Sequence, residues 1–431
     1  MPPEINKCVA RIIPRKMTIR GACVAIFSAV LAIAAPPVGQ DPGARLLESV
    51  VKANSMVLHL ENGSLKGAGA AFLLDEAARS QFVALGEEHN TTEIPELTTA
   101  LFRALQGNGF EYVADEQDPL TLRMASAKPA RGNRDSLVAF ARKYPSAFTF
   151  VSDQELTMLA DLGAASRGRG NALWGCDQAF GVTHILDRLI PLLQKPEART
   201  LAMALRDKAR DKEGVRNLEK FHYMSEVPKS DELAGLERVA AASAGSEAAF
   251  LIQALVVSDR VYRNYREKNY YDNGYEREEY MKQRFLEEYR RAQTADGRAP
   301  KVILKFGHWH LFRGQGPSNL QTLGNFVSEF AIANGSRSFH VAIYPFGDSG
   351  GYGDIKSWKP STAFLLAAGS SASQWTIVDV RPLRAVYRQV TEKMSAEERD
   401  SFRRTVFGFD AVLYVGHMRP ATYLRNPGVA F

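Results

Sequence analysis

Short apolar runs alternate with a helical pattern in the first half of the chain. Runs at residues 81–86, 110–115 and 171–175 (QFVALG, FEYVAD and NALWG) each lead into polar or turn residues, which is typical of buried strands. Between the first two, residues 93–109 carry apolar side chains at helical spacing, with Pro95 in the first turn and glycines at the end. This alternation predicts an α/β fold with a mainly parallel central sheet and flanking helices.

A long helical block interrupts the pattern. Over residues 185–298 the apolar positions recur at helical spacing and most positions between them are charged or polar. Strand-like apolar runs then return at 301–307, 338–347, 374–380 and 409–416. Because the sheet resumes after the block, we expect one α/β domain over 40–431 with a helical insertion or cap over 185–298, rather than two independent domains.

The first 35 residues have the layout of a secretory signal peptide. Five basic residues and one acidic residue precede the apolar run GACVAIFSAVLAIAA, which holds small residues at Ala32 and Ala34 and ends at Pro36. The run is short for a membrane span, so we expect export to the periplasm or the medium, with no integral membrane segment after removal of residues 1–35. A retained membrane anchor is the alternative, and Met17 offers a second start for the same leader.

The charge argues against a nucleic-acid partner, and the cysteine content argues against an internal disulfide. The net charge is +6 at pH 7, and the leader accounts for +4 of it (five basic residues less one acidic), which leaves too little positive charge to indicate a nucleic-acid partner. Of three cysteines, Cys8 and Cys23 lie in the leader. Cys176 then remains alone, so we expect no internal disulfide in the mature chain.

Acidic residues and histidines follow the ends of several predicted strands. In chain order they are Glu87, His89, Glu93, Glu116, Asp177, His308, His310 and His417. The carboxyl ends of parallel strands meet at one edge of a sheet, where ligands collect. We therefore expect these side chains to gather in one cleft.

Two kinds of chemistry fit such a cluster. A carboxylate beside an imidazole orients the ring and raises its basicity, so that it can take a proton from water. Three or more converging side chains could instead hold a divalent metal ion that activates water, with His89, His308 and Glu87 as the candidate ligands. If the strand at 301–307 continues, His308 and His310 project to the same side of it. Trp309, between them, is expected to pack into the core.

Taken in order, these stretches resemble the erythromycin esterase family, within the superfamily that also holds the haem-binding uptake lipoproteins and the Tiki/TraB proteases. The resemblance spans most of residues 80–418 and rests on ALGEEHNTTEIPEL, GFEYVADEQD, LWGCDQ, YEREEYMKQRF, KFGHWH and FGFDAVLYVGHMRPA. The chain departs from the esterases in several places, among them Asn90 in place of a glycine and Glu278 in place of an aspartate. Glu87 and His89 are two residues apart instead of three, which is closer to the haem-uptake branch, and Trp309 replaces an asparagine.

The resemblance implies a cleft of acids and histidines. Its principal residues would be Glu87, His89, Glu116, Arg277, His308 and His310, with Glu93, Asp177 and His417 as secondary candidates. In this cleft His308 or His89 would be the general base for an attacking water, held by a glutamate. Arg277 would stabilise the developing oxyanion.

The sequence therefore predicts an exported hydrolase that acts on an ester or lactone, with a small molecule as substrate and a divalent metal ion as an option. Two alternatives remain open. One is a haem- or iron-binding protein of the uptake type, and the other is a metal-dependent peptidase. Neither a metal nor haem follows from the residues alone.

Overall fold

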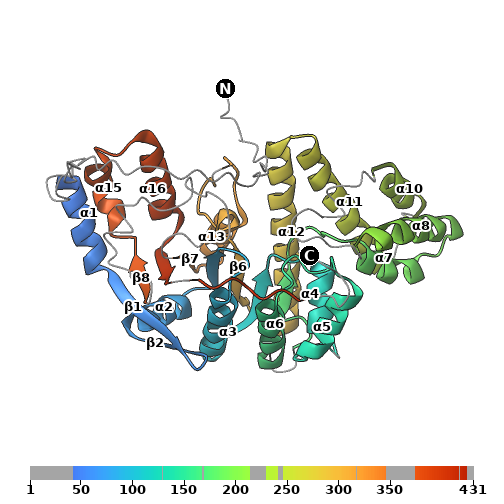
Figure 1. Ribbon diagram of the computed structural model, residues 1–431, viewed down its shortest axis with the longest axis horizontal. Helices are drawn as coiled ribbons and strands as arrows, with labels where there is room; N and C mark the ends of the chain where they lie inside the picture. The colour runs from blue at the N-terminus through green and yellow to red at the C-terminus, as the bar shows by residue number, and fades with distance from the viewer. Residues whose placement is uncertain are drawn as a thin grey trace, which may run out of the picture. The chain divides into compact units, whose positions relative to one another are not determined.

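One nine-stranded sheet runs through the described part of the chain in the computed structural model (Figure 1). The order of its strands is β2-β1-β8-β9-β7-β3-β6-β4-β5. The residues that the structure describes are 42–128, 130–166, 169–213, 230–240, 246–316, 318–345, 374–416 and 418–424.

Six neighbouring strands of the sheet are parallel. They are β9 (Ala411–Val415), β7 (Ser338–Pro345), β3 (Phe82–Glu87), β6 (Lys301–Gly307), β4 (Phe110–Asp115) and β5 (Leu173–Gly175). Three antiparallel strands extend the sheet beyond β9, namely β8 (Trp375–Asp379), β1 (Ser55–Glu61) and β2 (Ser64–Lys66). The expected α/β class and mainly parallel sheet are confirmed, whereas the hairpin of β1 and β2 was not expected from the sequence.

Helices cover both faces of the sheet, because alternate strand residues point to opposite faces. Val83 and Leu85 pack in a core with α2 (Ala68–Ala78), α3 (Glu93–Leu105), α4 (Pro119–Ser126), α5 (Arg134–Lys143) and α6 (Asp153–Ala165). Phe82 and Ala84 pack on the other side, with α1 (Pro42–Ala53), α12 (Tyr270–Asp296), α13 (Leu323–Ala333), α15 (Leu383–Thr391) and α16 (Ala396–Gly408). The strands are apolar on both faces for this reason.

The helical block has an apolar core of its own. The helices that form it are α7 (Thr183–Leu189), α8 (Pro196–Glu213), α10 (Ser230–Ala240) and α11 (Ser246–Arg266), at the right of Figure 1. The next helix, α12, returns to the sheet and buries Met281 and Phe285 against it. The division into one domain with an insertion or cap over 185–298 stays a prediction. None of the helices in the described ranges is long and apolar enough to cross a membrane.

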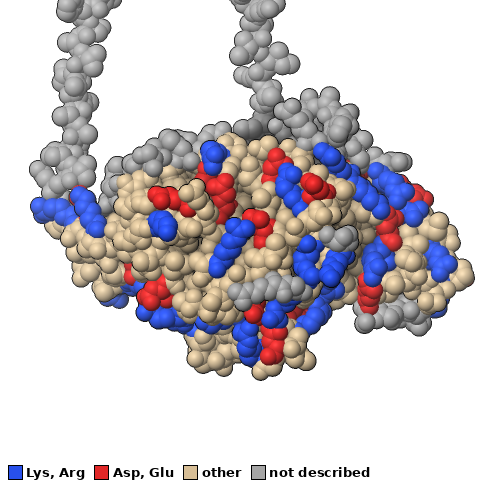
Figure 2. All heavy atoms as spheres, turned by 90° about the horizontal axis from the view of Figure 1, so that it is seen from below, with Lys and Arg blue, Asp and Glu red and all other residues tan. Residues whose placement is uncertain are grey.

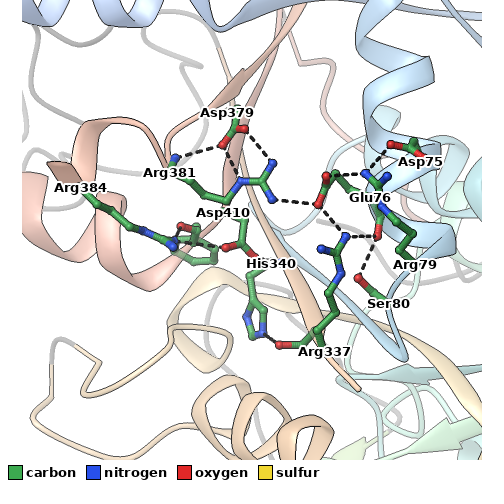
Figure 3. A network of polar contacts seen from close by, with 12 residues as sticks. Asp75, Glu76, Arg79, Ser80, Arg337, His340, Asp379, Arg381, Arg384 and Asp410 are labelled. Atoms are coloured by element: carbon green, nitrogen blue, oxygen red, sulfur yellow. Dashed lines mark hydrogen bonds and ion pairs between the residues drawn. The ribbon is translucent and has the colours of Figure 1, made fainter. Parts of the chain in front are cut away.

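Ion pairs join the elements at the amino-terminal edge of the parallel strands (Figure 3). The carboxylate of Glu76, on α2, accepts hydrogen bonds from Arg79, Arg337 and Arg381 at 2.8–2.9 Å. Arg337 directly precedes β7, and Asp410, which pairs with Arg384 nearby, directly precedes β9. This network fixes the edge opposite the candidate site, which forms at the carboxyl ends.

Charges of both signs are mixed on the surface. Figure 2, seen from below the view of Figure 1, shows basic side chains interspersed with acidic ones. Several are paired, for example Arg103 with Asp161 at 3.2 Å and Arg134 with Asp153 at 2.7 Å. The absence of a nucleic-acid partner stays a prediction from the sequence.

Candidate active site

Four parallel strands bring the candidate residues to one edge of the sheet. β3 ends at Glu87, and β4, β5 and β6 are followed by Glu116, Asp177 and His308. Glu87 lies beside Gly307 in the register of β3 and β6, and Asp115 lies between Lys305 and Gly175. The strand ends therefore lie within two residues of one another, and the polar residues that follow them meet.

A cavity of about 380 Å³ opens at this edge. The predicted residues that line it are His89, Glu116, Arg277 and His310. Glu87 and His308 lie behind its wall, with only 3% and 5% of their surface exposed. The residues of the cavity wall come from strands and helices more than two hundred positions apart.

His89 is held between two carboxylates. Its Nδ1 is 2.9 Å from Oε1 of Glu87, its Nε2 is 3.6 Å from Oε2 of Glu116, and its ring stacks on Phe150 with centroids 4.3 Å apart. Burial alone would lower the pKa of His89, but the charge of Glu116 and the contact with Glu87 outweigh it and raise that pKa to about 9. At neutral pH the ring is therefore an imidazolium.

Glu116 is the centre of the contacts in the cavity. Oε1 accepts a hydrogen bond from Nη2 of Arg277 at 2.6 Å, and Oε2 accepts one from the main-chain N–H of Gly307 at 2.7 Å. The Nε2 atoms of His310 and His89 lie 3.5 and 3.6 Å from these oxygens. Burial opposes ionisation, but the charges of His89 and Arg277 and the hydrogen bond from the N–H of Gly307 hold the pKa of Glu116 well below its usual range.

Arg277, on α12, is tied to two carboxylates. Its Nε and Nη2 donate to Asp177 at 2.9 and 2.7 Å, and the same Nη2 donates to Glu116. These donors are therefore engaged by the protein itself, which supports a role in fixing Glu116 rather than the expected contact with an oxyanion. Asp177 is fully buried, and its two carboxylate oxygens accept these two hydrogen bonds in a bidentate pair.

His310 is oriented by a glutamate in the same way as His89. Its Nδ1 is 2.6 Å from Oε1 of Glu278, and Oε2 of Glu278 accepts the main-chain N–H of Leu323 at 2.7 Å, at the start of α13. Glu278 therefore joins α12, α13 and the turn that carries His310. The Nε2 of His310 is left facing Glu116.

The strand does not continue through the two histidines, as it would have to for both to project to one side. β6 ends at Gly307, and His308–His310 form a single 3₁₀ turn. His308 is buried with Nδ1 3.3 Å from the main-chain oxygen of Glu87, and burial lowers the pKa of His308 to about 4. Trp309 is partly exposed and lines the cavity, so its expected place in the core is wrong.

The secondary candidates have different places. Glu93, at the start of α3, accepts hydrogen bonds from the main-chain N–H and the Nε of Arg419 at 3.0 and 2.8 Å, so it holds the C-terminal segment. His417 lies outside the described residues, as does the leader over 1–35. A Gly-Asp-Ser-Gly-Gly sequence around Ser349, which has the G-x-S-x-G pattern of a serine nucleophile, lies outside them too.

Lys305 belongs to the site and was not expected from the sequence. It lies on β6, fully buried, with Nζ 2.9 Å from Oε1 of Glu87, 2.9 Å from Oε1 of Glu155 and 3.6 Å from Oδ1 of Asp115. The one signal in the sequence is a lysine inside the otherwise apolar run KVILKFG. A buried strand does not accept a charge unless partners meet it.

The residues predicted as metal ligands do not fit a metal ion. Oε1 of Glu87 already contacts Lys305 and His89, and Nδ1 of His308 faces a main-chain oxygen. Within the described ranges, no group of three or more His, Cys, Asp and Glu side chains is arranged to hold one.

The fold, rather than the sequence, is what the chain shares with proteins of known structure. No family model matches the sequence, and no curated protein matches it. A protein from Bacillus cereus matches with a TM-score of 0.52 at 12% identity, over 89% of this chain and 99% of that one. A succinoglycan biosynthesis protein matches at 0.55 and 16%, over 88% and 99%. A histidine-to-asparagine mutant of the erythromycin esterase EreC, in its open conformation, matches at 0.56 and 13%, over 86% and 100%. The chain therefore has an erythromycin esterase-like fold.

Proposed function

We propose that the chain is a hydrolase that attacks an ester or lactone with water in this cavity. One observation carries the proposal: two imidazoles, each held at Nδ1 by a glutamate, present Nε2 to the same cavity within 3.6 Å of Glu116. The erythromycin esterase-like fold supports a hydrolase. The alternatives of haem binding and of a metal-dependent peptidase stay predictions, and so does export.

His89 serves as the acid of the pair. With a pKa of about 9 it is protonated at neutral pH, so it cannot take a proton from water but can donate one. Its Nε2–H, at the cavity wall, donates a hydrogen bond to the carbonyl oxygen of the substrate and stabilises the negative charge that develops there. This is the role that the resemblance implied for Arg277.

His310 serves as the general base. Its Nδ1–H donates to Glu278, which fixes the tautomer with the lone pair on Nε2 and directs that atom at the cavity. A water molecule beside Nε2 then loses its proton to the ring as it attacks the carbonyl carbon. When the tetrahedral intermediate collapses, the C–O bond to the leaving alcohol breaks and the ring returns that proton to the alkoxide oxygen. Glu116, fixed by Arg277 and by the N–H of Gly307, keeps the two imidazoles apart at a set distance.

Hydrolysis of a panel of nitrophenyl esters and lactones tests the proposal. In the variants His89→Gln and His310→Gln we expect kcat/KM to fall by about 100- to 10,000-fold, the usual worth of a positioned acid or base. The matched control His59→Gln replaces an exposed histidine on β1 and should leave the rate unchanged.

Three results would contradict the proposal. Activity that survives in both cavity variants removes the imidazoles from the mechanism. Activity that a chelator abolishes makes the reaction dependent on a metal ion. Activity that is lost in Ser349→Ala but kept in His310→Gln makes a serine the nucleophile. Circular dichroism of each variant verifies that it is folded.

A further inference from the structure

A cluster of buried charges lies directly beneath the candidate active site. Lys305 on β6 contacts Glu87 on β3, Asp115 on β4 and Glu155 on α6, and all four are at least 96% buried. Nζ of Lys305 also lies 5.7 Å from the centroid of the Phe150 ring, on which His89 stacks. The cluster therefore reaches the cavity both through Glu87 and through Phe150.

One oxygen atom links the cluster to the cavity. Oε1 of Glu87 accepts hydrogen bonds from Nζ of Lys305 and from Nδ1 of His89, each at 2.9 Å. The lysine and the imidazole thus share one acceptor. A stronger or weaker hydrogen bond from Lys305 to this oxygen therefore changes the electrostatic interaction between Glu87 and His89.

Lys305 carries one positive charge but contacts three carboxylates, so it cannot neutralise all of them. Oδ2 of Asp115 and Oε2 of Glu155 are enclosed, and neither has a hydrogen-bond partner among the described residues. Burial on this scale would be costly for a group without a function, because uncompensated charges are expelled from a protein interior. A structural ion pair would need only one of the three acids.

We propose that Lys305 is a positioning residue of the candidate active site, which fixes Glu87 beneath His89 and limits how tightly that carboxylate holds the proton of the imidazole. Glu155, by competing for the same ammonium group, works in the opposite direction. The consequence for hydrolysis rests on the function proposed above, but the coupling of Lys305 to His89 does not.

The sign of the coupling follows from the groups that face the pair. Lys305 faces Glu87, Asp115 and Glu155, whereas His89 faces Glu87 and also Glu116, beyond which lie Arg277 and His310. Burial raises the pKa of Asp115 to about 6 and that of Glu155 to about 7, so both are ionised where His89 titrates, near pH 9. Removing the cation therefore raises the pKa of His89, and removing the anion of Glu155 lowers it.

Titration of the His89 ring by NMR in the full chain tests the proposal without any substrate. In Lys305→Met we expect the pKa of His89 to rise, and in Glu155→Gln to fall, each by about half a unit or more. The ring signal is assigned by its loss in His89→Gln. Lys301→Met is the matched control, since Lys301 lies on the same strand but its Nζ donates to the main chain of Ala78.

Kinetics then test the consequence. For any ester that the protein hydrolyses, the alkaline limb of kcat should move in the same two directions, while KM changes less than twofold. A merely structural role would lower stability in both variants but would not move the limb in opposite directions. If Lys305→Met does not fold, Glu155→Gln, which keeps the lysine, carries the test.

The possible outcomes separate this inference from the proposed function. Shifts of opposite sign without any hydrolysis support the coupling and contradict the hydrolase. Hydrolysis with no shift in Glu155→Gln, or with shifts of the same sign in both variants, overturns the coupling and leaves the hydrolase standing.

Discussion

At the scale of single residues, the sequence brought the candidate residues to one edge of the sheet but did not show their contacts. His89, Glu116 and His310 could be predicted to meet because each follows the end of a parallel strand. Glu87, which orients His89, was among the predicted residues, but the acid that orients His310 was not, because Glu278 lies on a helix whose rotation is set by packing. Lys305 was missed for a similar reason, since its three acceptors come from separate elements.

Substitution of Gly307 tests whether the position of the His89 ring in the cavity matters to the reaction. A Cβ atom at this position would lie 2.8 Å from Nε2 of His89 and 3.4 Å from Oε2 of Glu116, whereas the backbone angles (φ −49°, ψ 137°) suit alanine. In Gly307→Ala we therefore expect the His89 ring to be displaced toward solvent, and kcat/KM for an ester substrate to fall by about tenfold or more.

The matched control is Gly107→Ala, because a Cβ atom at Gly107 would meet nothing within 4 Å. Thermal unfolding should show a small loss for Gly307→Ala, since His89 is partly exposed and can move aside. An unchanged rate in Gly307→Ala would show that the position of the His89 ring does not matter to the reaction.

At the scale of elements, apolar runs predicted the parallel strands well, and the prediction failed where the chain turns. The run KVILKFG predicted the end of β6 at Gly307 correctly, but it does not show the 3₁₀ turn over His308–His310 that follows, because so short a turn has no apolar pattern of its own. The hairpin of β1 and β2 lies partly exposed at the far edge and has a weak apolar pattern. Whether a segment at the edge of a sheet forms a strand depends more on the neighbouring strand than on its own residues.

Glu278 gives a test at this scale, because one carboxylate joins three elements. In Glu278→Ala the buried N–H of Leu323 at the start of α13 loses its acceptor, and we expect the free energy of unfolding to fall by about 1–3 kcal/mol. Denaturant unfolding measures it. Glu279→Ala removes the neighbouring glutamate, which pairs with Lys282 in the same helix, and should cost about 0.5 kcal/mol or less. Equal losses in the two variants would mean that Glu278 does not join the elements.

At the scale of the whole molecule, buried ionisable groups make stability depend on pH. Burial lowers the pKa of His340 to about 3, against about 6.5 for an exposed histidine in an unfolded chain. The unfolded chain therefore binds the proton first as the pH falls. This histidine contributes stability above pH 6.5 and loses it toward pH 3, by up to about 1.4 kcal/mol per pH unit.

A comparison of variants isolates this effect, because the raised pKa values of Asp115 and Glu155 act in the opposite direction over part of the range. Relative to the native chain, His340→Gln should be destabilised most at pH 7, and the difference in unfolding free energy should shrink as the pH falls to 4. A constant difference for His340→Gln would mean that the ring has the same pKa in the folded and in the unfolded chain.

The central place of β3 has a consequence for synthesis. Its residues Phe82–Glu87 are all buried, yet the strands on either side of it, β6 and β7, begin at Lys301 and Ser338. A ribosome adds roughly 5–20 residues per second, so both edges of this apolar strand stay unpaired for about 10–40 s after it is made. During that time the two unpaired edges of β3 make the nascent chain prone to aggregation.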